Sequence, residues 1–335
     1  MIFPKGYFQD EIREGFLVPE MMKRAWAAAL EVLEVIKDIC RENGLVYYAA
    51  YGTLLGTIRH KGFIPWDDDI DIYMFRNDYD RLIEIADTCL PEGFVLSGIY
   101  GKNERLWGAN SEPQLRVIAD EQYFTLPSYM NRFHSYPYMR IGIDIFPLDN
   151  VPEDVQEQYE IVKLSNDIHF IIANWELLRE NGELEDRIVK TEKMLGVEYL
   201  RDDENLLKRE MRLYADRLAA SCEDDTGKVA DILYCMPPGE RDKFTGIKAM
   251  RSTWFGKGVS MLFENTQITV PEQYKEVLRV SVGEDYMIPK PFTADHEYPF
   301  YKTQEKAFIK LLRDSGIDSS ADEFCRNWHK INDYK

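Results

Sequence analysis

The hydrophobic positions in the first part of the chain change repeatedly between a helical and a strand period. Between residues 19 and 43 apolar side chains recur at steps of three and four, so the spacing predicts one helix with a buried stripe. Residues 45–51, LVYYAAY, are aromatic and β-branched at strand length, and Gly52 ends this expected strand. A short helix can begin directly afterwards, and its free N–H groups would then lie at Gly52 and Thr53.

A loop, a strand and a helix follow. Pro65 forbids a helix through the loop KGFIPW. Residues 70–75, IDIYMF, alternate Asp71 with apolar neighbours as a half-buried strand does, and residues 77–90 resume the helical period. Two more strands are expected, at residues 113–120 and 138–146.

The second half of the chain differs in character from the first. Residues 153–221 are charged and helical in period, with breaks near Asn181-Gly182 and at Gly196. After Asp224-Asp225 there are short β-like runs and a helical segment, PEQYKEVLRVSV. The order of elements predicts an α+β fold, in which a small mixed sheet carries the functional site and a mostly helical region adds to it.

Composition narrows the classes of function. With 335 residues and 45% hydrophobic content, the chain can build a sizeable core in one or two domains. A formal net charge of −18 argues against nonspecific binding to nucleic acid, which needs a basic face, although a local basic pocket for a phosphorylated ligand is compatible with it.

The cysteines and the apolar segments indicate the cellular compartment of the protein. The five cysteines are scattered, odd in number and without a CxxC, which argues against a disulfide framework or a structural zinc site. The start of the chain, MIFPKGYFQDEIREGF, lacks the apolar run of a signal peptide. The most apolar stretches are short and contain glutamates, so no membrane span is expected. We therefore expect a soluble, cytoplasmic protein.

Four aspartates, Asp67, Asp68, Asp69 and Asp71, crowd the start of the predicted strand at 70–75. Asp69 and Asp71 lie two residues apart, so both side chains leave the same face of the strand and can chelate one cation. Carboxylate oxygens without nearby histidine or cysteine favour Mg²⁺ or Mn²⁺ over zinc.

Three other interpretations of the aspartates exist. A solvated acidic turn is disfavoured because Trp66, Ile70 and Ile72 place the segment partly in a core, where unpaired carboxylates are costly. An EF-hand fails because Ile72 occupies the position that requires glycine, and Asp78 the position of the bidentate glutamate. A glycosyltransferase-type DxD would also hold a metal against a nucleotide diphosphate, and the aspartates alone do not separate it from other transferases.

The residues upstream add a phosphate-binding element. Gly52-Thr53 ends a strand and opens a helix, the arrangement in which backbone N–H groups are offered to a phosphate. Arg59 and Lys61 follow as candidate ligands of a diphosphate, with a solvated surface as the alternative for both. Together with the aspartate pair, the turn predicts a phosphate–metal site within a short span of sequence.

These residues resemble a known family. The stretch YYAAYGTLLGTIRHKGFIPWDDDIDIYMFRNDYDRL, with RIGIDIFPLDNVPED downstream, is similar to the LicD family of phosphorylcholine transferases. That family includes the fukutin-type ribitol-phosphate transferases and belongs to the polymerase-β-like nucleotidyltransferase superfamily. The similarity is specific over residues 45–82 and 138–152, and weaker at 263–265, 268–278 and 283–287.

The resemblance implies roles for individual residues. Gly52 and Thr53 would start the phosphate-binding helix, with Thr53 replacing the usual small second residue of the superfamily. Asp69 and Asp71 would hold the metal, and Asp144 would complete the metal site or accept a proton. Asp67 and Asp68 also belong to the family signature, and positioning of the loop is their expected role.

The resemblance also implies a reaction. A CDP-linked alcohol, CDP-choline by default, would transfer its phosphoalcohol to a sugar hydroxyl of a glycan or glycolipid, as in modification of lipopolysaccharide or teichoic acid, with peripheral contact to a membrane-bound acceptor. Ribitol or glycerol as the alcohol, a sugar-nucleotide glycosyltransferase and a non-catalytic relative are the alternatives.

Weaker candidates could contact the substrate. Arg116 and His296 are candidate substrate ligands. Four aromatic residues are candidate members of a choline cage, with core packing as the alternative: Trp107, Tyr286, Tyr298 and Tyr301.

The chain is expected to divide into three parts, which could also form one continuous domain. They are a nucleotidyltransferase-like catalytic core at 1–152, a helical insertion at 153–222, and a C-terminal α/β part at 223–335 that completes the active site.

Overall fold

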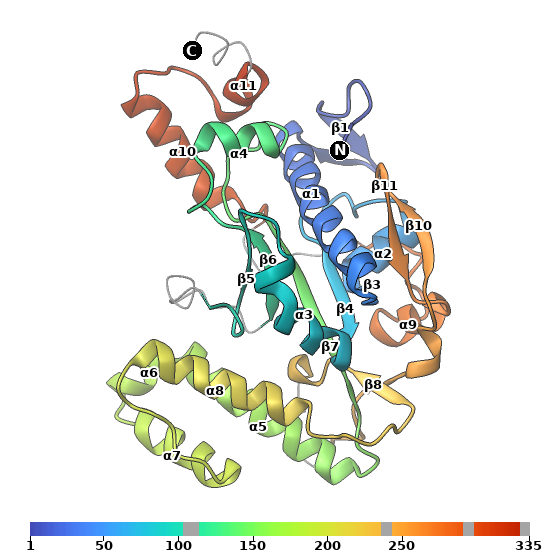
Figure 1. Ribbon diagram of the computed structural model, residues 1–335, viewed down its shortest axis with the longest axis vertical. Coiled ribbons are helices and arrows are strands. Elements are labelled where there is room, and N and C mark those ends of the chain that lie inside the picture. The colour runs from blue at the N-terminus through green and yellow to red at the C-terminus, as the bar shows by residue number, and fades with distance from the viewer. Residues whose placement is uncertain (103–113, 236–242, 291–297, 329–335) are drawn as a thin grey trace.

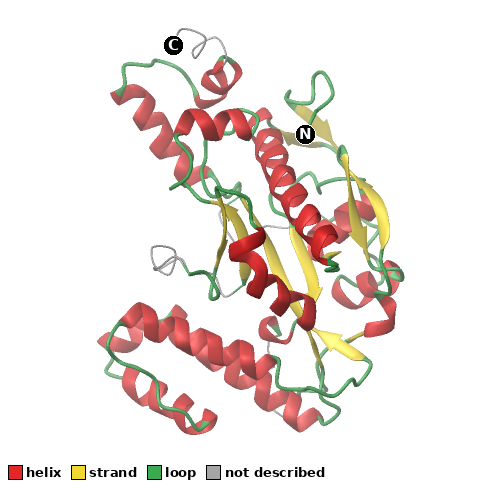
Figure 2. Cartoon of the chain, in the orientation of Figure 1, coloured by secondary structure: helices red, strands yellow, loops and turns green. Residues whose placement is uncertain are grey.

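A mixed β-sheet lies at the centre of the molecule, and helices pack around it (Figures 1 and 2). The computed structural model describes residues 1–102, 114–235, 243–290 and 298–328. Within these ranges the main sheet has seven strands, in the order β3-β4-β7-β6-β5, with β8 and β9 continuing from β7. The strands are β3 (Tyr48–Ala49), β4 (Asp71–Phe75), β5 (Phe94–Ser97), β6 (Leu115–Ala119), β7 (Gly142–Asn150), β8 (Lys228–Ala230) and β9 (Met250–Arg251).

The direction of the strands makes the sheet mixed. β4 and β7 are parallel, whereas β3 pairs antiparallel with β4, and β6 and β8 pair antiparallel with β7. Parallel neighbours need a long crossover, and here the chain between β4 and β7 supplies it with α3 (Arg76–Cys89), β5, β6 and α4 (Leu126–Arg132). The predicted α+β class with a small mixed sheet is confirmed.

Helix α1 (Glu20–Asn43) confirms the longest sequence-based prediction. Its apolar stripe, which includes Trp26 and Leu30, is fully buried, and the helix packs against β6 and β7 (Figure 1). Gly44 ends the helix in the left-handed conformation, with φ 68°, and its N–H bonds to the Cys40 carbonyl oxygen.

The strand expected at 45–51 is much shorter than predicted, because the chain turns into a helix before its end. Only Tyr48–Ala49 pairs as β3, and α2 (Tyr51–Arg59) begins at once. The Thr53 hydroxyl accepts a hydrogen bond from the Asp71 N–H, with a distance of 2.8 Å from Asp71 N to Thr53 Oγ1. This contact with β4 fixes the start of α2, and the aromatic run in the sequence does not reveal it.

The helices of residues 153–221 share a second hydrophobic core, distinct from the one around the main sheet. The predicted breaks are present, since Gly182 and Gly196 both adopt positive φ beside helix ends. Residues of β8 and η2 (Ile232–Tyr234) join this second core, and the division into three parts stays a prediction. The helices are α5 (Val155–Ala173), α6 (Trp175–Glu180), α7 (Leu184–Leu195) and α8 (Glu204–Ala219).

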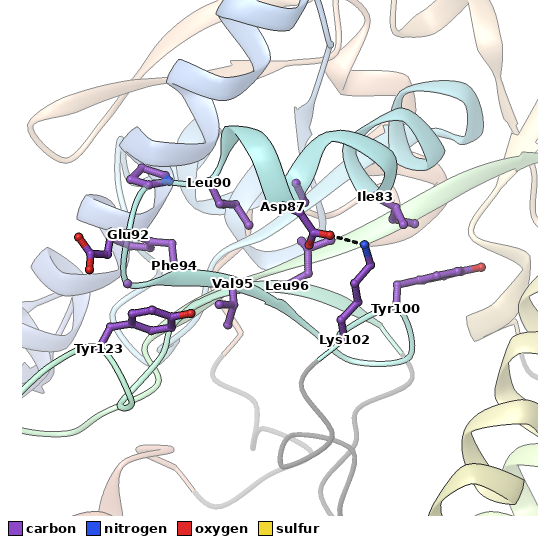
Figure 3. A pocket seen from close by; sticks show the side chains of 13 residues that line it. Ile83, Asp87, Leu90, Glu92, Phe94, Val95, Leu96, Tyr100, Lys102 and Tyr123 are labelled. Atoms are coloured by element: carbon purple, nitrogen blue, oxygen red, sulfur yellow. Dashed lines mark hydrogen bonds and ion pairs between the residues drawn. The ribbon is translucent and has the colours of Figure 1, made fainter.

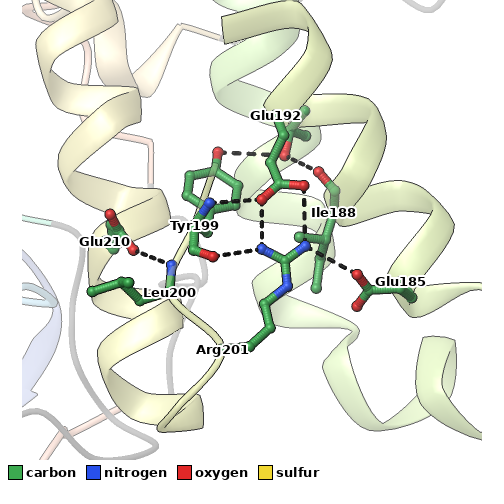
Figure 4. Close-up of polar contacts among 8 residues, drawn as sticks. Glu185, Ile188, Glu192, Tyr199, Leu200, Arg201 and Glu210 are labelled. Atoms are coloured by element: carbon green, nitrogen blue, oxygen red, sulfur yellow. Dashed lines mark hydrogen bonds and ion pairs between the residues drawn. The ribbon is translucent and has the colours of Figure 1, made fainter. Parts of the chain in front are cut away.

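The loop between α7 and α8 is held by charged side chains (Figure 4). Arg201 pairs with Glu192 and Glu185, both on α7. The Tyr199 N–H donates to Glu192 at 2.6 Å, and the Leu200 N–H donates to Glu210 of α8 at 3.0 Å. These contacts fasten the loop to both of the helices that it joins.

A half-buried arginine joins the helical region to the main sheet. Arg76, directly after β4, donates to both oxygens of Asp149 on β7, at 2.6 and 2.9 Å. It also donates to both oxygens of Asp216 on α8, at 3.0 and 3.1 Å. Tyr100 donates a further hydrogen bond to Asp216. This doubly bidentate cluster connects the ends of β4 and β7 to α8.

The remaining elements lie at the two ends of the chain. The expected β runs near 258–270 form an antiparallel hairpin, followed by the expected helix. No helix in the described ranges is long and apolar enough to cross a bilayer. These elements are β1 (Glu11–Arg13), β2 (Phe16–Val18), η4 (Ser252–Trp254), β10 (Val259–Phe263), β11 (Thr266–Val270), α9 (Tyr274–Ser281), α10 (Lys302–Asp314) and α11 (Ala321–Arg326).

Candidate active site

Three charged side chains form a row across neighbouring strands of the main sheet. Asp71 on β4 lies in register with Asp144 on the parallel strand β7, and Asp144 lies in register with Arg116 on β6. Residues directly opposite one another in a sheet point to the same face, so the three side chains are neighbours. The structure thus brings together Asp71 and Asp144, which the sequence separates widely, and adds Arg116 to them.

Asp144 has a polar partner at each oxygen. Arg116 forms an ion pair with Oδ1, and the side-chain amide of Gln114 donates to Oδ2 at 2.9 Å. Arg116 was the weaker of the predicted cationic ligands, yet it is the cation beside the carboxylates. A period-two pattern joins Gln114 and Arg116 in the sequence, but nothing there shows that their strand pairs with the one that carries Asp144.

The loop before β4 holds the other aspartates. Asp67, Asp68 and Asp69 each place a carboxylate oxygen within 4.8 Å of the others. Asp68 is buried and accepts the Phe300 N–H at 2.7 Å, while the Trp26 indole donates to the Asp67 carbonyl oxygen at 3.0 Å. The loop is therefore fixed from two sides, by α1 and by the segment at residue 300.

The electrostatics of this cluster favour a bound cation. Burial, followed by the charges of Asp69 and Asp144, raises the pKa of Asp71 well above its ordinary value. Burial, followed by the charge of Asp69, likewise raises the pKa of Asp67. A positive ion among these groups would relieve the repulsion. The donor set consists of carboxylate oxygens alone, which fits Mg²⁺ or Mn²⁺.

The first turn of α2 lies against the aspartate loop. A Cβ atom at Gly52 would overlap the Asp67 carboxylate, so that carboxylate lies directly over the helix start. Thr53 uses its hydroxyl to accept the Asp71 N–H, and its carbonyl oxygen accepts from the Thr57 hydroxyl at 2.7 Å. The close approach explains why residue 52 is a glycine. The predicted phosphate-binding turn and the acidic cluster are therefore adjacent in space.

Arg59 is the last residue of α2, about 10 Å along the helix from Gly52 at 1.5 Å per residue, and Lys61 follows two residues later. The Arg59 guanidinium donates to the Tyr286 carbonyl oxygen at 3.0 Å and to the His60 ring at 2.7 Å. Lys61 is exposed, and its ammonium donates to the Ile58 carbonyl oxygen at 3.2 Å. The structure does not bring these two cations to the aspartates, and their role in diphosphate binding stays a prediction.

The aromatic candidates are mostly packed in the core. Tyr286 and Tyr301 are buried, and Tyr301 stacks on Tyr138 with ring centroids 5.1 Å apart. Core packing accounts for both. His296 and Trp107 lie outside the described residues.

A cavity of about 280 Å³ opens beside the aspartates. Its polar wall includes Asp68, Asp69, Arg116 and Asp144. Phe300, Ala29 and Gln114 also line it, and the sequence analysis identified none of these three. Its described lining consists of Ala29, Asp68, Asp69, Gln114, Arg116, Ile141, Gly142, Asp144 and Phe300.

A second cavity, of about 400 Å³, lies between α3 and β5 (Figure 3). An ion pair between Asp87 and Lys102 crosses it, and Phe94 and Tyr123 supply aromatic lining. None of the predicted site residues is part of its described lining. The acidic cluster therefore marks the first cavity as the candidate active site.

Residues 44–170 match the family described as LicD/FKTN/FKRP, nucleotidyltransferase domain. The lipopolysaccharide cholinephosphotransferase LicD of Haemophilus influenzae is 30% identical over 141 residues, which are 40% of this chain and 46% of that protein. An uncharacterized protein of Rickettsia prowazekii is 36% identical over 103 residues, 29% of this chain and 39% of that protein. The chain thus aligns with less than half the length of these relatives. The resemblance seen in the sequence is confirmed.

Proposed function

Since residues 44–170 form a LicD-family domain, we propose that the chain is a metal-dependent transferase of phosphoalcohols. The donor is CDP-choline, and the acceptor is a sugar hydroxyl of a cell-surface glycan or glycolipid precursor. The choline donor is suggested by the name of the Haemophilus influenzae relative. The observation that carries the proposal is the row of Asp71, Asp144 and Arg116 beside the acidic loop and the start of α2.

The fold proposed for this core is that of the polymerase-β-like nucleotidyltransferases. The order of parts supports it: a strand runs into a helix start at Gly52, a carboxylate pair follows at β4, and a third carboxylate lies on the adjacent strand β7. Catalysis in such a site consists mainly of positioning and charge stabilisation.

Each group of site residues has its own role in the transfer of the phosphoalcohol. Asp69, Asp71 and Asp144 would hold a divalent cation, which when bound supplies Lewis-acid stabilisation of the phosphoryl and leaving oxygens. The N–H groups at the start of α2 bind the nucleotide phosphate. The acceptor hydroxyl attacks the phosphorus next to the alcohol, the bond to CMP breaks, and a phosphodiester forms. Asp144 acts as a metal ligand or receives the hydroxyl proton.

The nucleotide product identifies the reaction. Incubation with CDP-choline and an acceptor extract should release CMP, whereas a DxD glycosyltransferase would release UDP from UDP-sugars. CDP-ribitol and CDP-glycerol test the alternative alcohols. Nucleotide binding without turnover of any donor would identify a non-catalytic relative.

We place the reaction in the cytoplasm, with peripheral contact between the enzyme and a membrane-bound acceptor.

The proposal predicts that activity depends on a divalent metal. Because the proposed ligands are all carboxylates, excess EDTA should abolish CMP release, and added Mg²⁺ or Mn²⁺ should restore it. The measurement is CMP formation after chelation and after metal titration, with zinc as the control ion. Full activity in excess chelator would end the metal-dependent part of the proposal.

A second prediction concerns the helix start. Gly52→Ala adds a methyl group where the Asp67 carboxylate lies, so both the carboxylate and any phosphate at this turn must shift. We expect the affinities for CDP-choline and for CMP to fall together, by roughly tenfold, the cost of one lost hydrogen bond to a charged group. Calorimetric titration of both ligands at matched salt measures this.

Thr53→Ser is the matched control for this turn. It keeps the hydroxyl that accepts the Asp71 N–H, so it should bind both ligands as the wild type does. Unchanged affinities in Gly52→Ala would remove the turn from the nucleotide site.

A further inference from the structure

A glutamate far from the aspartates in the sequence holds the turn that leads to them. The Glu264 carboxylate accepts the Phe63 N–H at 3.3 Å, and the Glu264 N–H donates to the Lys61 carbonyl oxygen at 2.8 Å. Arg13 of β1 donates to both oxygens of the same carboxylate, at 2.6 and 3.2 Å. Only 5% of the Glu264 side chain is exposed. Glu264 therefore fastens the turn at 61–63 to the hairpin of β10 and β11.

The backbone on both sides of this contact is adapted to it. Glu264 and Asn265 form the two-residue turn of the hairpin, since Phe263 pairs with Thr266. Glu264 has φ 53°, in the left-handed region that glycine and asparagine favour in such turns. On the opposite side, a Cβ atom at Gly62 would lie 2.2 Å from Glu264 Oε1. A glutamate in an uncommon conformation thus packs against a glycine that leaves room for its carboxylate.

The same turn lies directly against α2. A Cβ atom at Gly56 would lie 2.4 Å from the Gly62 carbonyl oxygen, and the Gly62 N–H donates to the Gly56 carbonyl oxygen at 3.4 Å. The turn at 61–63 is therefore enclosed between Glu264 and the helix whose start is proposed to bind phosphate.

From this turn the contacts continue to the aspartate loop. The Phe63 ring stacks on Trp26 with ring centroids 4.7 Å apart, and the Arg13 guanidinium lies 5.1 Å from the Trp26 ring. The Trp26 indole donates to the Asp67 carbonyl oxygen at 3.0 Å, and the Asp67 N–H donates to the Ile64 carbonyl oxygen at 2.9 Å. A displacement of Phe63 would therefore be passed on to the start of the aspartate loop.

We propose that Glu264 is a positioning residue of the metal site, which acts through the turn at 61–63 and touches neither metal nor substrate. The proposal rests on the proposed function, because it takes the aspartates to be the metal ligands. Groups that orient metal ligands typically change the affinity for the metal by roughly 10- to 100-fold when they are removed.

The first test measures binding of Mn²⁺ alone. Glu264→Ala removes the acceptor of the Phe63 N–H and the partner of Arg13. We expect the dissociation constant of Mn²⁺, measured by calorimetric titration well below the unfolding temperature, to rise by roughly tenfold, the lower end of that range. A purely structural role would lower the unfolding temperature and leave the Mn²⁺ affinity of the folded protein unchanged.

Glu272→Ala is the matched control, just after the hairpin's last strand. The Glu272 carboxylate accepts the Lys257 N–H at 3.0 Å, and a Cβ atom at Gly256 would overlap it, as one at Gly62 would overlap Glu264. The control therefore removes the same kind of contact away from the turn at 61–63. It should bind Mn²⁺ as the wild type does.

The second test approaches the contact from the other side. Gly62→Ala places a methyl group against the Glu264 carboxylate, so it should also weaken Mn²⁺ binding by roughly tenfold. In the Glu264→Ala background the overlapping atoms are absent, and the added methyl should change the affinity by less than about twofold. Gly62→Ala by itself decides the proposal if Glu264→Ala does not fold.

Amide hydrogen exchange follows the loop without any metal. Residues 61–69 should exchange faster in Glu264→Ala than in the wild type, and at the wild-type rate in Glu272→Ala. Unchanged Mn²⁺ affinity in folded Glu264→Ala, or an equal loss in Glu272→Ala, would overturn the proposal. If the wild type binds no Mn²⁺, the metal-dependent part of the proposed function fails, and unchanged exchange at 61–69 would then overturn the positioning role of Glu264 separately.

Discussion

Replacing Asp71 with asparagine should lower turnover by roughly two orders of magnitude or more, the scale seen when a group that stabilises transition-state charge is removed. The change keeps the shape of the side chain but removes a charged ligand at the centre of the row with Asp144. The measurement is the rate of CMP release at saturating donor and Mg²⁺. Asp38→Asn, an exposed aspartate on α1, serves as the control and should leave the rate unchanged.

The same variant should not weaken the metal-free fold. Burial and neighbouring carboxylates raise the pKa of Asp71, so the folded protein holds this proton to higher pH than the unfolded chain does. The free energy of unfolding therefore falls as pH rises from the ordinary aspartate pKa toward the raised value. Asp71→Asn removes this pH-dependent loss of stability. In EDTA near neutral pH, the free energy of unfolding of the variant should therefore be at least that of the wild type. Below the ordinary aspartate pKa the two proteins should not differ. Unfolding of the variant with unchanged specific activity would make Asp71 a structural residue.

Replacing Arg76 with alanine should cost about 3–5 kcal/mol of unfolding free energy, the range for breaking a buried ion pair by removing one partner. Arg76 is the shared partner of Asp149 and Asp216, which are both almost fully buried. Its removal leaves two carboxylates without that cation. Urea denaturation gives the free energy of unfolding for wild type and variant.

A matched control lies on the same helix. Arg81 is exposed and pairs with Glu84, so Arg81→Ala should change stability by about 0.5 kcal/mol or less. A cost for Arg76→Ala no larger than that of the control would mean that the cluster around Arg76 does not hold the helical region to the sheet. Because Arg76 and Asp149 lie near the ends of the strands that carry Asp71 and Asp144, reduced turnover in folded Arg76→Ala protein should accompany the loss of stability.

Periodicity and local chemistry in the sequence were enough to predict the elements. The apolar steps of three and four predicted α1, and the glycines at 182 and 196 predicted helix ends, because these features act within a few residues of one another. The alternation around Asp71 gave β4 for the same reason. The α+β class followed from the order of these elements, and the resemblance to the LicD family was recognisable from the acidic signature.

The tertiary structure decided what surrounds each candidate residue. The strand predicted at 45–51 is limited to Tyr48–Ala49 because α2 begins at Tyr51. The Thr53 hydroxyl, in the first turn of α2, accepts a hydrogen bond from the Asp71 N–H of β4. Arg59, a predicted ligand of the diphosphate, lies at the end of α2 away from Gly52, and Lys61 follows just after the helix. The sequence gives the order of Gly52 and the two cations along the chain. Their separation in space depends on the helix between them.

The partners of the aspartates also came from the fold alone. Arg116 lies beside Asp144 because β6 pairs with β7 in one particular register. The Phe300 N–H donates to the Asp68 carboxylate, although the two residues are 232 positions apart in the sequence. The sequence by itself determined which residue types were available for a metal and a phosphate, and on which face of each element they lie. Strand register and the packing of distant segments are set by non-local hydrogen bonds and burial, so only the tertiary structure could decide which of those residues share a site.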